Sequence, residues 1–395
     1  MKHKLILFTL AGVNFTHIMF TMILMPLGDL FMTEFEITAL QFSHLVSVYA
    51  FSAFLSGFVG IFLMDLFDRK HTLLFLYTGF GITAFACGLV QNYEQLLALR
   101  FVSGAFGGVI GALALSIISD LFSYKERSGA LGIIMAGFSA AAALGVPFGL
   151  ILADWYGWRV PFFFIGGLGL LLTTFIVFTF PTIKPQTESN KMTLRNNPLV
   201  KIVADKNQVM ALTVAFFLIL GHFIIIPFVA PYMMRNAGFD MQQISWIYLV
   251  GGGLTVFSTP AIGKLTDRIG PGRAIWLFMC LSFIPVVLLT NLWEVGLFFG
   301  LLVTSGFFVL GSGRMIAPQT MITAPAPTDT RGGFMSLKSS LQQLSIALSS
   351  FIAGMIVQIS EDGTFVNYDI VGYLSIVLCL IAVYLTMRLK VAAGN

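Results

Sequence analysis

The run VMALTVAFFLILGHFIIIPFVAPYM, residues 209–233, contains no charged side chain. About 20 apolar residues are enough to cross the hydrocarbon core of a bilayer as a helix, whereas a strand needs only about ten. A strand in lipid would also leave backbone amides without hydrogen-bond partners. This run is therefore predicted to be a membrane-spanning helix. It contains a histidine, His222, nine residues before Pro231.

Runs of this kind fill the chain. Of its 395 residues, 57% are hydrophobic and only 10% are charged, where soluble proteins carry about 25% charged residues. This composition excludes a soluble globular enzyme. A net charge of +4 is too small to indicate a nucleic-acid partner. The three cysteines, Cys87, Cys280 and Cys379, lie in apolar runs, so we expect no disulfide and no thiol chemistry.

We predict an all-α integral membrane protein with twelve spanning helices. The predicted spans are residues 5–27, 45–64, 72–90, 96–121, 130–153, 160–180, 209–233, 244–262, 274–290, 295–321, 334–359 and 370–387. Seventeen Lys and Arg residues fall on the side of the N-terminus, and only Arg159 and Arg235 fall on the opposite side. Because cytoplasmic loops carry the excess of cations, both termini are predicted to lie in the cytoplasm and the chain in the cytoplasmic (inner) membrane.

Sequence landmarks repeat along the chain. The nine-residue spacing of His222 and Pro231 recurs at His17 and Pro26. The acidic residues after the second and eighth spans, and the basic motifs before the fifth and eleventh spans, repeat at a similar offset of 202 to 204 residues. Internal duplication is the usual construction of secondary transporters. The chain is therefore predicted to be a duplicated six-helix unit with a cavity where the halves meet.

A polar stretch between the sixth and seventh spans marks the boundary of the repeat. We expect an N-terminal six-helix half over residues 1–181, a cytoplasmic linker over 182–207 and a C-terminal six-helix half over 208–395.

Four motifs carry a family resemblance. The loop after the eighth span, GKLTDRIG at residues 263–270, closely resembles the signature loop of the major facilitator superfamily, Gly-x-Leu-x-Asp-Arg-x-Gly-Arg-Lys. The first-half copy, IFLMDLFDRK at 61–70, keeps the Asp and the basic pair. RFVSG at 100–104 is similar to the family's Arg-x-x-x-Gly. GVPFG at 145–149 is close to the Gly-Pro-x-x-Gly of drug and sugar efflux members, with one residue inserted.

This resemblance implies two pseudo-symmetric six-helix halves that rock around a central cavity lined by spans 1, 4, 7 and 10. The charges of the signature loops recur in both halves on the cytoplasmic side, where pairs of them can latch the halves in one state. Anchoring of the loops to lipid headgroups is the alternative. The predicted gating residues are Asp65, Arg69, Arg127, Asp267, Arg268 and Arg331.

The deep ionisable residues are basic, and no Asp or Glu lies near the middle of a predicted span. A charge at the bilayer centre costs about 3 kcal/mol even on lenient scales, so these residues should face a cavity or a partner. A basic cavity favours an anion. Arg314 is the principal candidate for substrate binding, because a guanidinium binds carboxylate or phosphate with two parallel hydrogen bonds. A buried Arg satisfied by neighbouring carbonyls is the alternative.

Other polar residues complete the predicted substrate site. Lys338 and the two glutamines one turn further on form a polar stripe, or Lys338 extends to the inner headgroups. His17 and His222 occupy matching depths of the two halves, and Asn14 lies one turn before His17. The predicted binding residues besides Arg314 are His222, His17, Asn14, Lys338, Gln342 and Gln343.

The two histidines are also predicted proton carriers, because histidine titrates near neutral pH. For each of them, a neutral histidine hydrogen-bonded within the bundle is the alternative. Asp29 at the outer end of the first span is a further proton site, or else a solvated loop carboxylate. Arg100 is expected to be structural, as the family motif residue that it resembles packs between helices.

These features predict a monomeric secondary active transporter that moves a small organic anion or zwitterion by alternating access, with proton-coupled efflux by antiport. An uncoupled facilitator or importer of organic anions is the alternative. A membrane-embedded sensor or enzyme is a third hypothesis. The sequence near either histidine offers it no nucleophile, no paired carboxylates and no metal-ligand spacing. No nucleotide-binding loop or metal cluster is recognisable, so no cofactor is predicted.

Overall fold

The computed structural model describes residues 2–63, 67–182, 198–327 and 330–389. Within these ranges twelve helical segments are long and apolar enough to cross a membrane, which confirms the predicted all-α integral membrane fold. Six of them precede and six follow the gap at 183–197. The limits predicted for the halves and the linker stay a prediction.

The elements before this gap are α1 (Lys2–Ile23), α2 (Gly28–Glu34), α3 (Ala39–Leu63), α4 (Arg69–Ala86), η1 (Cys87–Leu89), α5 (Tyr93–Leu121), α6 (Tyr124–Ala140), η2 (Ala141–Gly145), α7 (Val146–Tyr156) and α8 (Arg159–Thr179). The elements after it are α9 (Pro198–Ala204), α10 (Lys206–Phe223), η4 (Ile226–Phe228), α11 (Val229–Ala237), α12 (Met241–Ile269), α13 (Pro271–Thr290), α14 (Leu297–Ile316), α15 (Gln319–Thr323), α16 (Arg331–Ile356), β1 (Gln358–Ile359), β2 (Phe365–Val366) and α17 (Tyr368–Thr386). Short helix α9 therefore lies inside the predicted linker.

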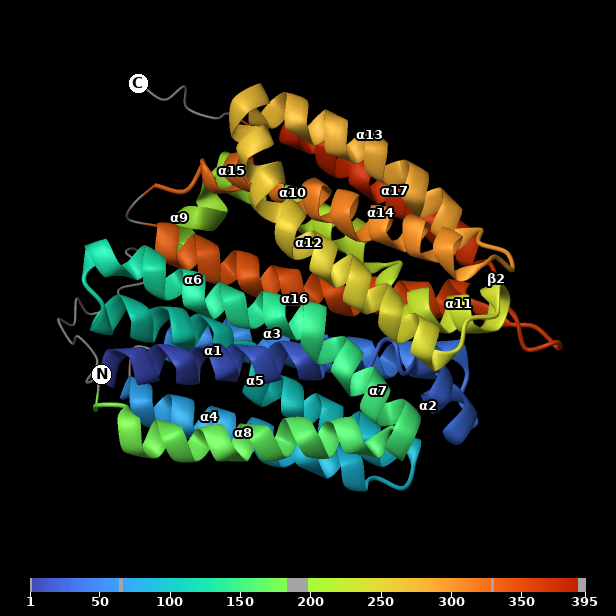
Figure 1. Cartoon of the computed structure of the whole chain (residues 1–395). Helices are drawn as coiled ribbons and strands as arrows, with labels where there is room; N and C mark the ends of the chain where they lie inside the picture. The colour runs from blue at the N-terminus through green and yellow to red at the C-terminus, as the bar shows by residue number, and fades with distance from the viewer. Residues whose placement is uncertain (1, 64–66, 183–197, 328–329, 390–395) are drawn as a thin grey trace.

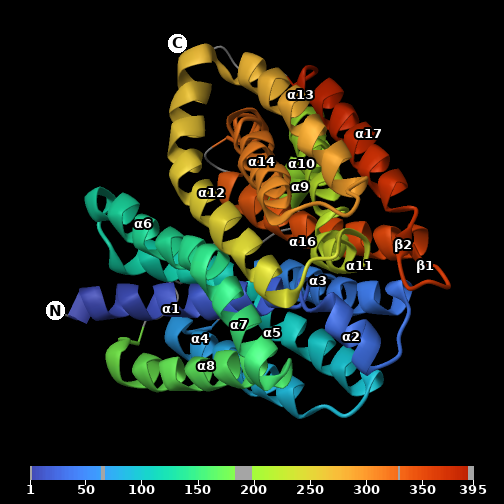
Figure 2. The ribbon, with the colours of Figure 1, turned by 45° about the vertical axis from the view of Figure 1, so that its right-hand side comes forward.

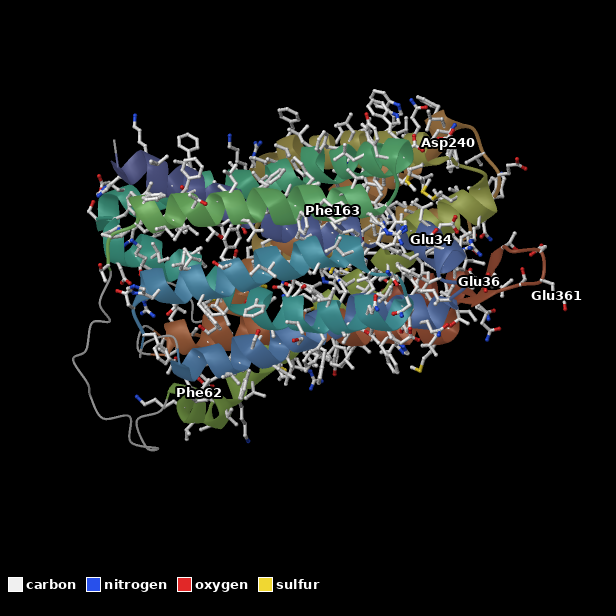
Figure 3. The ribbon with its side chains drawn as sticks, turned by 90° about the horizontal axis from the view of Figure 1, so that it is seen from below. Glu34, Glu36, Phe62, Phe163, Asp240 and Glu361 are labelled. Carbon is white, nitrogen blue, oxygen red and sulfur yellow. The ribbon has the colours of Figure 1, made fainter. Side chains whose placement is uncertain are left out.

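The two sets of helices form two bundles that pack against each other, as Figures 1 and 2 show. Between the bundles, α3 packs against α16, and α12 packs against η2 and α7. We name the side where α1 begins and α17 ends the terminal side. The opposite side, with α2, α11 and the β1–β2 hairpin, is the far side (Figure 1). Glu34, Glu36, Asp240 and Glu361 gather on the far side in Figure 3, away from Phe62.

Helix ends follow local side-chain chemistry. Asn92 caps α5, since its side chain accepts a hydrogen bond from the amide of Gln95. Asp240 and Gln243 form a capping box at the start of α12. These caps satisfy backbone amides that would otherwise lack partners where the chain enters the membrane. They fix the far-side ends of two spans.

Prolines interrupt three of the spans that the family resemblance places around the cavity. The first helix ends at Ile23, shortly before Pro26, and so stops before the end of the predicted span 5–27. The seventh span breaks into a 3-10 turn at Pro227, and α14 ends just before Pro318. Proline lacks an amide hydrogen and disfavours helical geometry in the residue before it. Each break interrupts the regular helical hydrogen bonding of its span.

The fifth span contains a π-helical turn, η2. This turn leads directly into the GVPFG motif at 145–149, which has one residue more than the family pattern. A π turn takes up an extra residue without ending the helix. At this turn the two bundles approach closely, because a Cβ added at Gly252 would lie 2.9 Å from the Cα of Ala143.

Buried apolar side chains connect the bundles unevenly. One cluster runs from the first bundle into the far-side part of the second and includes Phe42 and Phe228, whose rings pack at 5.7 Å. The terminal-side part of the second bundle has a separate cluster that includes Ile202 and Phe334. The continuous core thus joins the bundles on the far side.

Candidate functional site

Arg314 in α14 and His222 in α10 form a buried pair. Nη2 of Arg314 lies 2.8 Å from Nδ1 of His222, and Arg314 is 1% exposed. A guanidinium can only donate hydrogen bonds, so Nδ1 accepts and the ring proton lies on Nε2. The ring stacks on Phe307 with centroids 6.1 Å apart and stays partly exposed. The pair therefore presents a neutral histidine with an N–H donor.

The rest of the Arg314 guanidinium has no hydrogen-bond partner in the part of the chain that the structure describes. Its Nε and Nη1 atoms are buried and donate no hydrogen bond to any described residue. The alternative interpretation, a buried Arg314 whose guanidinium is satisfied by neighbouring carbonyls, therefore does not hold for these two atoms. Two unit charges 4 Å apart interact by about 4 kcal/mol at an effective dielectric constant of 20, so an anion here would be strongly favoured. The position is chemically suited to a carboxylate, sulfonate or phosphonate.

His17 in α1 occupies the equivalent place in the first bundle but has a different partner. Its Nε2 lies 3.0 Å from the hydroxyl of Tyr49 in α3, and its ring meets Phe80 edge to face at 5.5 Å. Thr21 donates to the same hydroxyl at 3.4 Å. The guanidinium of Arg100 lies over the ring of Tyr49, 4.5 Å from the ring centroid. His17 is thus hydrogen-bonded to a hydroxyl rather than to a cation.

Each histidine packs against a glycine in the fourth span of its own bundle. A Cβ added at Gly107 would lie 3.0 Å from Nε2 of His17 and 2.5 Å from the hydroxyl of Tyr49. A Cβ added at Gly311 would lie 3.1 Å from Cε1 of His222. The internal repeat seen in the sequence therefore extends to the immediate surroundings of both rings.

Arg100 joins three helices of the first bundle. It donates to the carbonyls of Leu45 at 3.2 Å and Phe20 at 3.4 Å, and it is 1% exposed. Its guanidinium also lies 4.8 Å from the Phe20 ring. This agrees with the structural role expected of it.

The other predicted binding residues do not join Arg314. Asn14 donates to the carbonyl of Ile134 at 3.0 Å, which links α1 to α6. Lys338 donates to Gln319 at 2.5 Å, which links α16 to α15 near the terminal side. Among the described residues, Gln342 and Gln343 form no side-chain hydrogen bond, and Gln342 is exposed. The structure brings together Arg314 and His222 alone.

Asp29 is not a solvated loop carboxylate. It forms an ion pair with Arg235, which connects α2 of the first bundle to α11 of the second. Arg235 also donates to Thr33 at 3.5 Å and to the carbonyl of Gly363 at 3.3 Å, and it lies 5.3 Å from the Phe365 ring. Sequence reasoning missed Arg235 as a partner. The available signal was its position as one of two cations on the far side.

The β1–β2 hairpin supports this ion pair. Asn236 donates to the carbonyl of Phe365 at 2.8 Å and accepts from its amide at 2.9 Å. Hydrogen bonds from the hydroxyls of Ser360 and Thr364 lower the pKa of Asp362 in the hairpin turn to about 2. The turn therefore keeps its charge in mild acid, when other carboxylates begin to titrate.

Residues 10–218 and 211–393 each match the family model of the Major Facilitator Superfamily. This chain belongs to the major facilitator superfamily. Multidrug resistance protein MdtG of Escherichia fergusonii is 30% identical over 339 residues, which cover 82% of this chain and 80% of that protein. The uncharacterised MFS-type transporter YbcL of Bacillus subtilis is 24% identical over 349 residues, 88% of this chain and 86% of that protein.

Solved structures agree on the fold. A bacterial homologue of the human lysosomal transporter Spinster, in an inward-facing and unoccupied conformation, superposes with a TM-score of 0.78 at 16% identity. The match covers 98% of this chain and 96% of that chain. The fold of this chain is therefore that of a superfamily transporter.

The superfamily signature residues do not join the bundles in this conformation, as far as the described residues show. Arg69 pairs with Asp120 at 3.4 Å, and Arg127 donates to the carbonyls of Phe122 and Ser119 at the end of α5. Asp267, Arg268 and Arg331 are exposed and form no ion pair with a described residue. Asp65 lies outside the described residues. The gating role predicted for these six residues stays a prediction.

Proposed function

We propose that this superfamily member is a secondary active transporter that exports a small organic anion or zwitterion by alternating access. Arg314 carries the proposal, because it is a buried cation with two nitrogens that have no hydrogen-bond partner and no ion pair with an acid among the described residues. An anionic group on the substrate would supply the missing acceptors. His222 is the partly exposed member of the pair, so the substrate would reach the pair through it.

Alternating access is supported by the uneven contact between the bundles. Between described residues, the hydrogen bonds that join the bundles are Arg235 to Asp29, Arg235 to Thr33, and Ser350 to the carbonyl of Ser43 at 3.2 Å. All lie on the far side. The excess of Lys and Arg on the terminal side supports a cytoplasmic position for both termini. This conformation would then be closed to the outside.

The far-side ion pair of Asp29 and Arg235 adds a second gate to the one predicted on the terminal side. We place Asp29 and Arg235 in an outer gate that holds this conformation. The predicted residues of the terminal side would close an inner gate in the opposite conformation. Asp29 then belongs to the gate, which leaves a histidine of the spans to carry the proton.

Export coupled to protons is the proposed direction and energy source. The relatives named multidrug resistance proteins support export, and the two predicted proton carriers, His17 and His222, lie in the spans. We propose that the chain works as a monomer in the cytoplasmic membrane. Its halves would be residues 1–181 and 208–395, joined by the linker 182–207.

Uptake into inverted membrane vesicles with an acidic lumen tests this function. Three probes share one aromatic ring and differ in charge, namely benzenesulfonate, benzenesulfonamide and benzyltrimethylammonium. We expect the vesicles to accumulate benzenesulfonate at least tenfold over the other two probes, and to lose this accumulation when the gradient is collapsed. Equal accumulation of the three probes would contradict the anion site. Unchanged uptake without the gradient would favour the uncoupled facilitator.

A further inference from the structure

The two equivalent histidines differ in what their hydrogen-bond partners can do. We infer that His17 carries the coupling proton, whereas Arg314 holds His222 neutral so that its Nε2–H donates to the substrate. Arg314 is in this respect a positioning residue for His222. The inference rests on the proposed function and assigns separate tasks to the two halves.

His222 cannot take up a proton without losing its partner. A proton would have to bind at Nδ1, which accepts from Nη2 of Arg314 at 2.8 Å. The imidazolium has only donors, and the guanidinium has only donors, so the hydrogen bond would break. Two positive charges would then face each other in a buried site. His222 therefore keeps one form, with Nδ1 as acceptor and Nε2–H as donor.

His17 can take up a proton and keep its partner. The hydroxyl of Tyr49 donates or accepts, so the Nε2–H of a charged His17 can donate to it across the same 3.0 Å. No other described residue hydrogen-bonds the ring, and His17 remains partly exposed. On protonation the ring gains one proton from water and becomes a cation, and deprotonation returns it to water. No other bond forms or breaks.

The charged side chains on the helices around His17 do not contact its ring. Arg100 from α5 is the nearest cation, and it lies against the Tyr49 ring, fixed by two backbone carbonyls. From α4, Tyr77 is hydrogen-bonded to Thr16 at 2.7 Å. Among the described residues, the charged side chains of the neighbouring α6, α7 and α8 lie near helix ends, namely Glu126, Arg127, Asp154 and Arg159. None of them contacts the ring.

The assignment implies that proton and substrate occupy different halves. The proton binds in the first bundle and the substrate in the second, so the two never compete for one group. Coupling then runs through the rocking of the bundles, whose conformations differ in the access that they give to each site.

Nitrogen NMR of the full-length protein in lipid nanodiscs, labelled with 15N-histidine, tests the inference without any substrate. The chain has five histidines, and the variants His17→Gln and His222→Gln assign the two signals. Between pH 8 and pH 5 we expect His17 to pass from neutral to charged. We expect His222 to stay neutral with its proton on Nε2 throughout.

Two variants of Arg314 sharpen the test. In Arg314→Met the acceptor Nδ1 is released, and we expect His222 to titrate as well. In Arg314→Lys the cation and a donor remain, and His222 should stay neutral. Titration of His222 in the unaltered protein, or a His17 that stays neutral down to pH 5, would overturn the inference. Failure of benzenesulfonate transport would instead contradict the proposed function and leave this readout intact.

Discussion

The His17 region and the His222 region have the same frame and different chemistry. In both, a histidine of the first span of the half packs against a glycine of the fourth, at Gly107 and Gly311. The residue that hydrogen-bonds the ring differs. Tyr49, the partner of His17, comes from another helix, α3, whereas Arg314, the partner of His222, lies one turn beyond Gly311 on the same helix. Duplication thus accounts for the position of the rings, and one side chain in each half decides what the ring can do.

The largest expected effect comes from removing Arg314, the cation that lies beside His222 and has no counterpart beside His17. We expect Arg314→Ala to reduce benzenesulfonate exchange about 100-fold, because hydrogen bonds to charged groups contribute about 1.5–3 kcal/mol and tenfold corresponds to about 1.4 kcal/mol. Uptake by vesicles containing the variant measures this. The control is Arg159→Ala, which removes a far-side cation paired with Glu34 inside the first bundle. Equal losses in both variants would show that Arg314 has no special role.

Filling the glycine sites tests whether the two regions share one frame. Gly107→Ala should destabilise the protein by about 2 kcal/mol, because its Cβ would lie 2.5 Å from the Tyr49 hydroxyl. Gly311→Ala should cost less, since its nearest contact would be 3.1 Å. Gly111 has open space around it, so Gly111→Ala is the control and should raise stability by up to about 1 kcal/mol. Thermal unfolding in detergent gives the order, and a destabilised Gly111→Ala would refute the packing argument.

The ion pair of Asp29 with Arg235 holds the halves together on the far side in this conformation. We expect Asp29→Asn to raise the population open on the far side about fivefold, since a partly exposed ion pair contributes about 1 kcal/mol. Spin labels at Glu36→Cys and Glu361→Cys report the distance across the bundles, after Cys280→Ser removes an exposed native thiol.

The matched control for the gate is Glu34→Gln. It breaks the ion pair of Glu34 with Arg159, which lies within the first bundle. The spin-label distances should then stay as in the unaltered protein. A similar shift in both variants would mean that surface charge, rather than the gate, controls the conformation.

The smallest expected effect concerns the partner of His17. Tyr49→Phe removes the hydroxyl that hydrogen-bonds both forms of His17, and it disfavours the charged form by about 1 kcal/mol, because a hydrogen bond to a charged group is stronger by about that amount. Gradient-driven accumulation of benzenesulfonate should fall about threefold, and exchange without a gradient should not change. A parallel fall in exchange would indicate that Tyr49 acts on the substrate site instead.

The sequence was sufficient for the spans and for the equivalence of the histidines. Hydropathy identifies each membrane helix, because the bilayer requires a long apolar run, and the repeated spacing to proline aligns His17 with His222. The limits of the predicted span 295–321 also place Arg314 among the deep cations. These features depend on residues that are close in sequence or related by the repeat.

The partners of these residues could not be read from the sequence in the same way. Asp29 meets Arg235 across 206 positions, because the short helices α2 and α11 of different halves come together on the far side. Asn14 and Lys338 turn to neighbouring helices rather than to Arg314, which depends on helix rotation. The π turn η2 changes that rotation within the fifth span. Side-chain direction of this kind follows from packing, which hydropathy does not encode.

We assign proton binding to the first half and anion binding to the second. The most direct test compares His17→Gln and His222→Gln in vesicles, measuring benzenesulfonate exchange at equal pH and accumulation driven by a pH gradient. We predict that His17→Gln keeps exchange within twofold and loses accumulation at least tenfold, whereas His222→Gln loses both. Gradient-driven accumulation that persists in His17→Gln, or equal loss of exchange in the two variants, would contradict this assignment.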